Sequence, residues 1–315
     1  MGVAVSCEIY AQKRVLDISR TRIEDSVSYA YDTIDAVVRS QHLDQDIGFE
    51  APNEVLFISP ISFNHTAFSE KAIFSGCSFL RSINFFHCEF KKYSSFYEDN
   101  FGDTTYFVGS SFKKNVSYSD CKFGKVVLFS LASFDDSVDF SNASFGRLTD
   151  FGFARFGRSC DFNSVTLDKS TDFSYALFGK IAHFSYLTLT DSSRVIFRNT
   201  LLPDTIDLSF NTKLNTEIDL TIADFTDSSH FDISRNSYFK PHLILLYKTD
   251  ISKLKLDYTH FHLLLPDSIL DPYSIEDSNW LKITDDEKIS IYESLLNNFN
   301  AHGQKWLKTK NRAIF

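Results

Sequence analysis

The sequence predicts an all-β solenoid, a coil of short extended segments that turn at regular corners. One bulky side chain, nearly always Phe, recurs at spacings that alternate between five and six residues. A small or β-branched side chain stands two positions before almost every one of them, and no Pro interrupts residues 61–202. A pattern that stays in phase over so many units is typical of a repeat architecture.

The bulky positions form an uninterrupted ladder. A helix does not explain it, because steps of five and six residues wander around a helix of 3.6 residues per turn. A simple strand would need a period of two. The ladder consists of Phe63, Phe68, Phe74, Phe79, Phe85, Phe90, Phe96, Phe101, Phe107, Phe112, Tyr118, Phe123, Phe129, Phe134, Phe140, Phe145, Phe151, Phe156, Phe162, Leu167, Phe173, Phe178, Phe184 and Leu189.

These side chains are predicted to fill the inside of the coil. Residues i and i−2 of an extended chain point to the same side, so the aromatic residue and the small residue before it both point inward. The composition agrees, since 33 Phe stand against 1 Met and 2 Trp, as if one kind of slot were filled many times. The residues between them are mostly Ser, Asp, Asn, Lys, Arg and Gly and are expected outside.

Glycine marks one kind of corner. Gly adopts positive φ without a steric penalty, so a Gly at the start of a six-residue link is interpreted as the corner or bulge residue that absorbs the extra position. Such glycines are Gly102, Gly124, Gly146, Gly157 and Gly179.

The repeating unit resembles that of a known family. The segment FSNASFGRLTD at 140–150 is similar to the 11-residue double unit of bacterial pentapeptide-repeat proteins in their Phe-rich version. The clean match covers 63–194, and a degenerate form runs on toward 261. The resemblance implies a right-handed quadrilateral parallel β-helix with four inward bulky side chains in each turn of two units.

Four segments are expected along the chain. Residues 1–55 form an N-terminal region whose capping helix at about 24–43 is predicted from the helical spacing of Val27, Ala30, Ile34, Val37 and Val38. Residues 56–194 form the regular solenoid, 195–270 its irregular continuation, and 271–315 a C-terminal helical segment. Helical caps are expected at both ends, because an open solenoid end would recruit another chain.

The C-terminal helix has its own signals. Thr284 and Glu287 form a capping-box pattern, apolar residues from Ile289 to Phe299 follow at helical spacing, and Gly303 fits a helix stop. The segment YESLLNNFNAHGQKW resembles the helix that follows the repeats in membrane-anchored members of the family. We therefore expect either a soluble relative or a piece of an anchored one, with membrane contact only through a part beyond this chain.

Composition and motifs argue against chemistry. The net charge of −9 disfavours nucleic acid as a partner, and no catalytic, phosphate-binding or metal-binding motif appears, so neither an enzyme nor a cofactor is predicted. Four of the five cysteines, Cys77, Cys88, Cys121 and Cys160, fall in the inward small slot, where a thiol packs as a small hydrophobe. Unpaired thiols are typical of the cytoplasm.

Two sets of outward charges are candidates for a partner-binding surface. With two units per turn, three basic residues should align on one edge, and acidic residues should stack in two pairs. The simpler interpretation of both sets is a solvated face that keeps the rod soluble. The basic residues are Lys125, Arg147 and Lys169, and the acidic residues are Asp139 with Asp161 and Asp150 with Asp172.

The leading functional hypothesis is a non-catalytic structural or protein-binding module that presents a rigid rod surface. A soluble scaffold or sensory part of a membrane-anchored pentapeptide-repeat protein is a second hypothesis. A third is a DNA mimic that binds a topoisomerase, which would need a long continuous acidic face. The partner and the oligomeric state stay open at this point.

Overall fold

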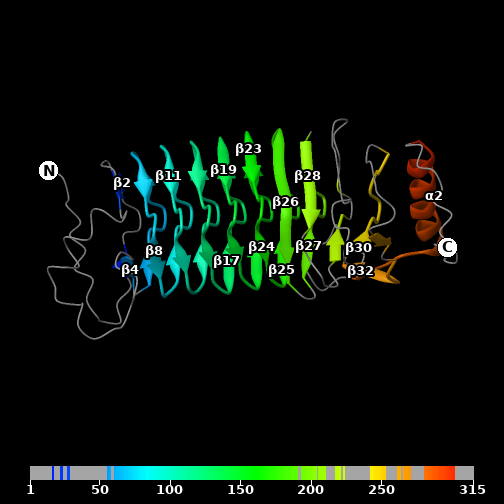
Figure 1. The fold of residues 1–315 in the computed structure, drawn as a ribbon, viewed down its shortest axis with the longest axis horizontal. Coiled ribbons are helices and arrows are strands. Elements are labelled where there is room, and N and C mark those ends of the chain that lie inside the picture. The colour runs from blue at the N-terminus through cyan, green and yellow to red at the C-terminus, as the bar shows by residue number, and fades with distance from the viewer. Residues whose placement is uncertain are drawn as a thin grey trace.

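The computed structural model describes residues 60–190, 193–203, 217–220, 223, 242–252, 261–263, 265–270 and 280–301, with short strands at 16–17, 22–23, 27–28, 55–57 and 205–210. These residues form a parallel β-solenoid whose strands stack along one long axis, and helix α2 (Asp285–Ala301) lies near one end of it (Figure 1). The predicted all-β solenoid is confirmed.

Each coil has four short strands, and between residues 55 and 189 the strands that pair in parallel lie 22 residues apart, as Ile61 and Ile83 do. We call the four columns sides A to D in chain order. Side A contains β1 (Leu16–Asp17), β5 (Ile61–Ser62), β9 (Ile83–Asn84), β13 (Thr105–Tyr106), β17 (Val126–Leu128), β21 (Leu148–Asp150), β25 (Ser170–Asp172), β27 (Arg194–Ile196), β29 (Glu217–Asp219), β30 (His242–Leu245) and β31 (Phe261–Leu263).

The other three sides follow the same order. Side B contains β2 (Arg22–Ile23), β6 (Ala67–Phe68), β10 (Glu89–Phe90), β14 (Ser111–Phe112), β18 (Ser133–Phe134) and β22 (Arg155–Phe156). Side C contains β3 (Val27–Ser28), β7 (Ala72–Ile73), β11 (Ser94–Ser95), β15 (Val116–Ser117), β19 (Ser137–Asp139) and β23 (Ser159–Asp161). Side D contains β4 (Val55–Phe57), β8 (Cys77–Phe79), β12 (Asn100–Phe101), β16 (Lys122–Phe123), β20 (Ser144–Phe145) and β24 (Thr166–Leu167).

The regular pattern changes at β26 (Ile181–Leu189). This long strand runs across sides C and D, pairing with β23 through Ile181 and with β24 through Leu189. Strand β28 (Thr205–Phe210) pairs in parallel with β26. The register of this pair shifts between Phe184 and Leu187. Side A continues in parallel pairing as far as β31, so the solenoid extends well beyond the ladder of Phe residues.

The interior is filled by aromatic rings, as the ladder predicts. Every ladder residue is at most 6 % exposed. On each side the rings stack nearly parallel on the rings of the next coil. Phe107, Phe129 and Phe151, for example, have centroids 4.8 and 5.1 Å apart and planes within 6°. Rings of neighbouring sides also meet edge to face, as Phe112 and Tyr118 do at 82°. Both arrangements are favourable aromatic geometries, so the rings stabilise the coil in two directions.

The corner prediction for glycine is wrong in its mechanism. Positive φ occurs in the five-residue links instead. Each of these links contains a four-residue turn whose third residue has positive φ. The N–H of the small-slot residue closes the turn, as Ala132 N does by donating to the carbonyl of Phe129. The glycines of the six-residue links are needed for close packing. A Cβ on Gly146 would lie 1.6 Å from the carbonyl oxygen of Gly124, and one on Gly179 would lie 1.4 Å from that of Gly157.

The N-terminal helix prediction is wrong at Val27 and Ser28. These residues form strand β3, which pairs with Ala72 and Ile73, and the rest of 24–43 lies outside the described residues. Strands β1 and β2 pair in the same way with β5 and β6, so the first coil begins near residue 16. Residues 29–54 then stand between β3 and β4. Val27 fits the helical spacing and the small slot equally well, which explains the error.

An antiparallel strand pair and helix α2 form the C-terminal end of the described chain. Strands β32 (Ser268–Leu270) and β33 (Trp280–Lys282) pair antiparallel, and helix α2 follows. The helix turns Ile291 and Asn298 inward, and Asn298 Nδ2 donates to the carbonyl of Ile251 at 2.5 Å. Ile289, Tyr292 and Leu296 face outward, so its buried stripe differs from the one that apolar spacing suggests. The predicted stop at Gly303 lies outside the described residues.

Replacing a ring in the middle of a column should create a cavity. Phe129 is fully buried, so Phe129→Ala is expected to lower the free energy of unfolding by about 3 to 5 kcal/mol. Urea unfolding followed by circular dichroism measures this. Phe129→Leu, which keeps most of the volume, should lose clearly less; an equal loss for the two variants would show that packing volume is not the cause.

Candidate partner-binding surface

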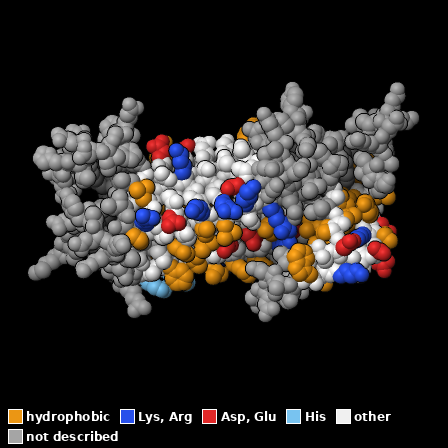
Figure 2. Space-filling model, turned by 90° about the horizontal axis from the view of Figure 1, so that it is seen from below, with side chains coloured by type: hydrophobic (Ala, Val, Ile, Leu, Met, Phe, Trp, Pro, Cys, Tyr) orange, Lys and Arg blue, Asp and Glu red, His pale blue; other side chains and the backbone are white. Residues whose placement is uncertain are grey.

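The three basic candidates lie in one row on the edge between sides D and A. Each precedes a strand of side A, and the backbone links successive coils there, since Leu148 N donates to the carbonyl of Lys125 and Ser170 N to that of Arg147. Lys125, Arg147 and Lys169 are all exposed. Figure 2 shows Lys and Arg side chains in a row along the rod, beside a band of apolar side chains.

The four acidic candidates stack in two pairs on opposite sides of the coil. Asp150 pairs in register with Asp172 on side A, and Asp139 with Asp161 on side C. The structure therefore brings Asp150 and Asp172 onto the side that the basic row borders. It does not bring the four carboxylates together into one acidic ridge.

Each of these carboxylates accepts a backbone hydrogen bond from the turn that follows it. Asp139 Oδ1 accepts the N–H of Ser141 at 2.8 Å, and Asp150 Oδ1 accepts that of Gly152 at 2.7 Å. Asp161 and Asp172 do the same for Asn163 and Ser174. The accepted N–H belongs to the second residue of the turn, and Asp side chains commonly accept such a hydrogen bond two residues on.

Partial burial acts on two of these acids. Desolvation raises the pKa of Asp150 against the hydrogen bonds from the Gly152 N–H and the Ser130 side chain, and the charge of Asp172 also raises it. Desolvation likewise raises the pKa of Asp161, against the hydrogen bond from Asn163. Half-buried carboxylates that already accept a backbone N–H are less available to a cation or to a basic partner than free surface acids would be.

Apolar side chains that the sequence analysis does not single out are exposed at the corner between sides A and B. Leu131, Phe153 and Tyr175 are 58, 55 and 37 % exposed and follow one another in three successive coils. Each is the positive-φ residue of its turn. The sequence does show a bulky apolar residue two positions after Phe129, Phe151 and Phe173. This pattern predicts exposure only once it is known that the five-residue links contain the turn.

The four thiols inside the solenoid are packing groups. Cys77, Cys88, Cys121 and Cys160 are buried and form no disulfide. Burial raises the pKa of the Cys88 thiol to about 12 and raises those of Cys121 and Cys160 as well. Two thiols also donate to the carbonyl of an aromatic residue in the preceding coil, Cys88 to Phe63 at 3.0 Å and Cys121 to Phe96 at 2.7 Å.

Asp99 is the one described acid that occupies an inward small slot of the Phe ladder. It is completely buried, its Oδ1 accepts the N–H of Cys77 at 2.7 Å, and its Oδ2 has no hydrogen-bond partner. Burial holds the pKa of Asp99 well above its usual range. Ser110, in the equivalent slot, donates its hydroxyl to the carbonyl of Phe85. A protonated Asp99 also carries an O–H donor, so the neutral carboxylic acid suits this position.

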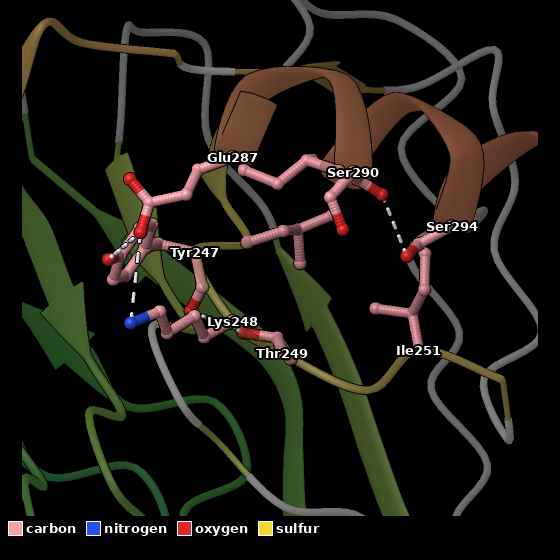
Figure 3. Close-up of a pocket in the computed structure, with 9 residues that line it drawn as sticks. Tyr247, Lys248, Thr249, Ile251, Glu287, Ser290 and Ser294 are labelled. Carbon is pink, nitrogen blue, oxygen red and sulfur yellow. Dashed lines mark hydrogen bonds and ion pairs between the residues drawn. The ribbon is translucent and has the colours of Figure 1, made fainter. Parts of the chain in front are cut away.

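A small cavity of about 160 Å³ lies between the last coils and α2. Figure 3 shows Tyr247, Lys248 and Thr249 on one side facing Glu287, Ser290 and Ser294 of the helix. Glu287 Oε1 accepts the hydroxyl of Tyr247 at 2.7 Å and lies 3.7 Å from Lys248 Nζ. These contacts attach the helix to the coil, so the cavity is part of the cap.

The start of α2 confirms the capping box. Thr284 N donates to Glu287 Oε2 at 2.9 Å, and Glu287 N donates to Thr284 Oγ1 at 3.3 Å. The hydrogen bonds from the Thr284 backbone and the Tyr247 hydroxyl lower the pKa of Glu287 to about 2.

Two kinds of feature are absent from the part of the chain that the structure describes. No group of three or more His, Cys, Asp or Glu residues there is arranged to hold a metal ion. A helix with the length and apolarity that crossing a bilayer requires is also absent from those residues.

Asp99→Asn should make the protein more stable, and increasingly so as pH rises. The folded state keeps Asp99 protonated where the unfolded chain has released the proton, so the free energy of unfolding falls with pH above the ordinary Asp value near 4, by up to about 1.4 kcal/mol per pH unit. An amide does not titrate. Urea unfolding at several values between pH 4 and 8 measures both proteins, with Asp99→Ser as a second non-titrating variant. Parallel pH curves for wild type and variants would contradict a neutral Asp99.

Glu287→Gln should loosen the helical cap at neutral pH. The lowered pKa means that Glu287 contributes stability above its ordinary pKa of 4.5, and that this contribution is lost as pH falls toward about 2. Hydrogen exchange of the α2 amides, corrected for intrinsic rates, should show faster exchange in the variant at pH 7 and a smaller difference from wild type at low pH. Glu293→Gln, which changes the same charge on the exposed face of α2, is the control and should leave exchange unchanged.

Comparison with known proteins agrees with the geometry. The family model for pentapeptide repeats, in nine copies, matches residues 118–166, a stretch that includes strands of all four sides. No curated protein and no solved structure matches the chain. The stacked rings, the 22-residue coils and the family match lead to one conclusion: the chain contains a pentapeptide-repeat β-solenoid.

Proposed function

We propose that the chain is a non-catalytic structural or protein-binding module whose rigid rod surface engages a protein partner. The observation that carries this proposal is the division between inside and outside. The interior of the regular coils is occupied by stacked rings and by the residues of the small slots, among them Asp99, and the other charged groups of these coils project outward at a fixed repeat. Such an interior offers no room for a substrate, whereas the outside offers ordered side chains.

Rigidity supports a binding role in energetic terms. Backbone N–H groups of one coil donate to carbonyls of an adjacent coil on all four sides, and the rings stack through the same coils. Side chains that are already held at fixed spacing lose little conformational entropy when a partner binds. A rod of this kind therefore spends little of its interaction energy on ordering itself.

The distribution of charge favours a protein partner over DNA mimicry. A DNA mimic needs a long acidic face, but the two described acidic pairs lie on opposite sides of the coil and each carboxylate accepts a turn N–H. Three cations border the side that carries Asp150 and Asp172. Mixed charge of this kind suits an interface with complementary charges of both signs.

The four buried thiols support a cytoplasmic location for this module. None of the four forms a disulfide, and in a reducing compartment they would remain thiols.

A photo-cross-linking residue placed on one side of the rod at a time tests the proposal. One outward position per side is Leu148 on side A, Arg155 on side B, Ser159 on side C and Lys122 on side D. In cells that normally express the protein, a binding module should give a strong cross-link to a protein from one side or from two adjacent sides.

Matched yields from all four positions would indicate random encounters and contradict the proposal, as would no adduct from any position. A gyrase supercoiling assay with excess purified chain is the companion experiment. Unchanged supercoiling is expected, and inhibition would favour the DNA-mimic function instead.

A further inference from the structure

The corner between sides A and B carries apolar side chains where the fold does not require them. Its positive-φ position is held by Leu131, Phe153 and Tyr175 in three successive coils, and we call these residues the apolar edge. Positive φ is unfavourable for bulky side chains and is normally taken by Gly or Asn in such a turn. Gly109 and Asn199 occupy the same column of turns on either side of the apolar edge.

The opposite corner shows that the turn itself tolerates polar residues. Between sides C and D, the equivalent positions in neighbouring coils are Asp120, Asn142 and Ser164, with φ of 58° or 59°. The apolar edge therefore combines an unfavourable backbone conformation with exposed apolar area, and neither helps the isolated chain. Conformational strain combined with an exposed apolar patch is typical of a contact site.

The edge is built as an ordered column. The rings of Phe153 and Tyr175 stack with centroids 4.7 Å apart and planes 1° from parallel. Leu177 and Leu201, which bridge to each other on the adjoining side, are 41 and 40 % exposed and extend the apolar area along the rod. The apolar surface thus runs along the rod axis, across successive coils.

The charge beside this column selects the partner's chemistry. Side A separates the apolar edge from the row of Lys125, Arg147 and Lys169. Leu128 and Leu148 lie on the strands between them, as do Asp150 and Asp172, whose carboxylates accept turn N–H groups. Figure 2 shows the parallel arrangement of cations and apolar side chains. A partner that covers both needs an apolar stripe with carboxylates along one flank.

The backbone of the edge excludes strand addition. Leu131 N donates to the carbonyl of Gly152, Phe153 N to that of Ser174, and Tyr175 N to that of Arg198, each at 2.8 or 2.9 Å. These donors are used in coil stacking, so a partner must bind through side chains. An α-helix along the rod repeats its side chains about every 5.4 Å, close to the coil spacing of about 4.8 Å, so positions i, i+4 and i+7 could meet three successive coils.

We propose that the apolar edge and the Lys125–Arg147–Lys169 row together form a docking surface for an amphipathic α-helix of a partner protein, with acidic residues along one flank of its apolar stripe. This rests on the proposed function and names the surface and the partner's chemistry. The helix lies along the rod, its apolar stripe covers Leu131, Phe153 and Tyr175, and its carboxylates face the basic row.

A peptide library tests both the chemistry and the place. Helical peptides displayed on phage, with a fixed Leu stripe and both flanks randomised, are selected on the full chain, and enriched peptides are synthesised and titrated by fluorescence anisotropy. Selection should enrich Asp and Glu on one flank only. Phe153→Asn should weaken binding at least tenfold without lowering the urea midpoint of unfolding, because Asn suits positive φ.

Two matched controls separate the surface from general effects. Tyr186→Asn makes the same change at a positive-φ residue of the opposite corner that is 56 % exposed, and it should leave peptide binding unchanged. Arg147→Glu should weaken binding and flatten its salt dependence, whereas Arg158→Glu, on the edge between sides B and C, should not.

Several results would overturn the inference. Enrichment of Lys or Arg flanks, no enrichment at all, or equal binding by the Phe153→Asn variant would each do so. Peptides that lose binding with Tyr186→Asn instead would move the site to another corner and leave the binding-module proposal intact. Binding to phosphatidylglycerol vesicles that Phe153→Asn abolishes, without peptide enrichment, would assign the edge to a lipid surface.

Discussion

The flat contact between one aromatic ring and the ring of the next coil is the interaction on which the other features depend. Stacked centroids lie 4.5 to 5.4 Å apart in all four columns, close to the spacing of about 4.8 Å at which parallel strands form hydrogen bonds. Rings and backbone therefore require the same coil spacing. Leu167, which takes a ring position, shows that the column tolerates an aliphatic side chain when its neighbours hold the spacing.

The periodic part of this fold could be predicted from the sequence because a single constraint is repeated. The alternation of five and six residues identified the inward positions, including the cysteine slots, and their burial is confirmed. The same alternation did not show which link contains the positive-φ turn. His65, Glu98, Leu131 and Asn142 all occupy that turn position, so no residue type marks it. Glycine, the usual marker, instead allows backbones to approach closely at Gly146 and Gly179.

The outer surface was harder to predict, because alignment along the rod does not determine what a side chain contacts. The stacking of Asp150 with Asp172 follows from the repeat, but the turn N–H groups that they accept follow from the corner geometry. Beyond the Phe ladder, Asp219 is held in a fully buried position by Arg194 at 2.9 Å and Arg198 at 2.7 Å. Arg194 and Arg198 stand 25 and 21 residues before Asp219, in a stretch where the period is irregular, so periodicity could not pair them.

The first coil shows how such a rod tolerates change. Its first three strands align with β5, β6 and β7, and the fourth aligns with β8, although residues 29–54 intervene between β3 and β4. Registration survives because each strand finds its place through its neighbour in the adjacent layer and not through its distance along the chain. Two consecutive strands can thus be separated by many residues while the coils stay aligned. The position of an outward side chain along the rod is then set by the coil to which it belongs. Adding or deleting one whole coil would shift all side chains beyond it by about 4.8 Å along the axis, so the number of coils sets the distance between two surface groups.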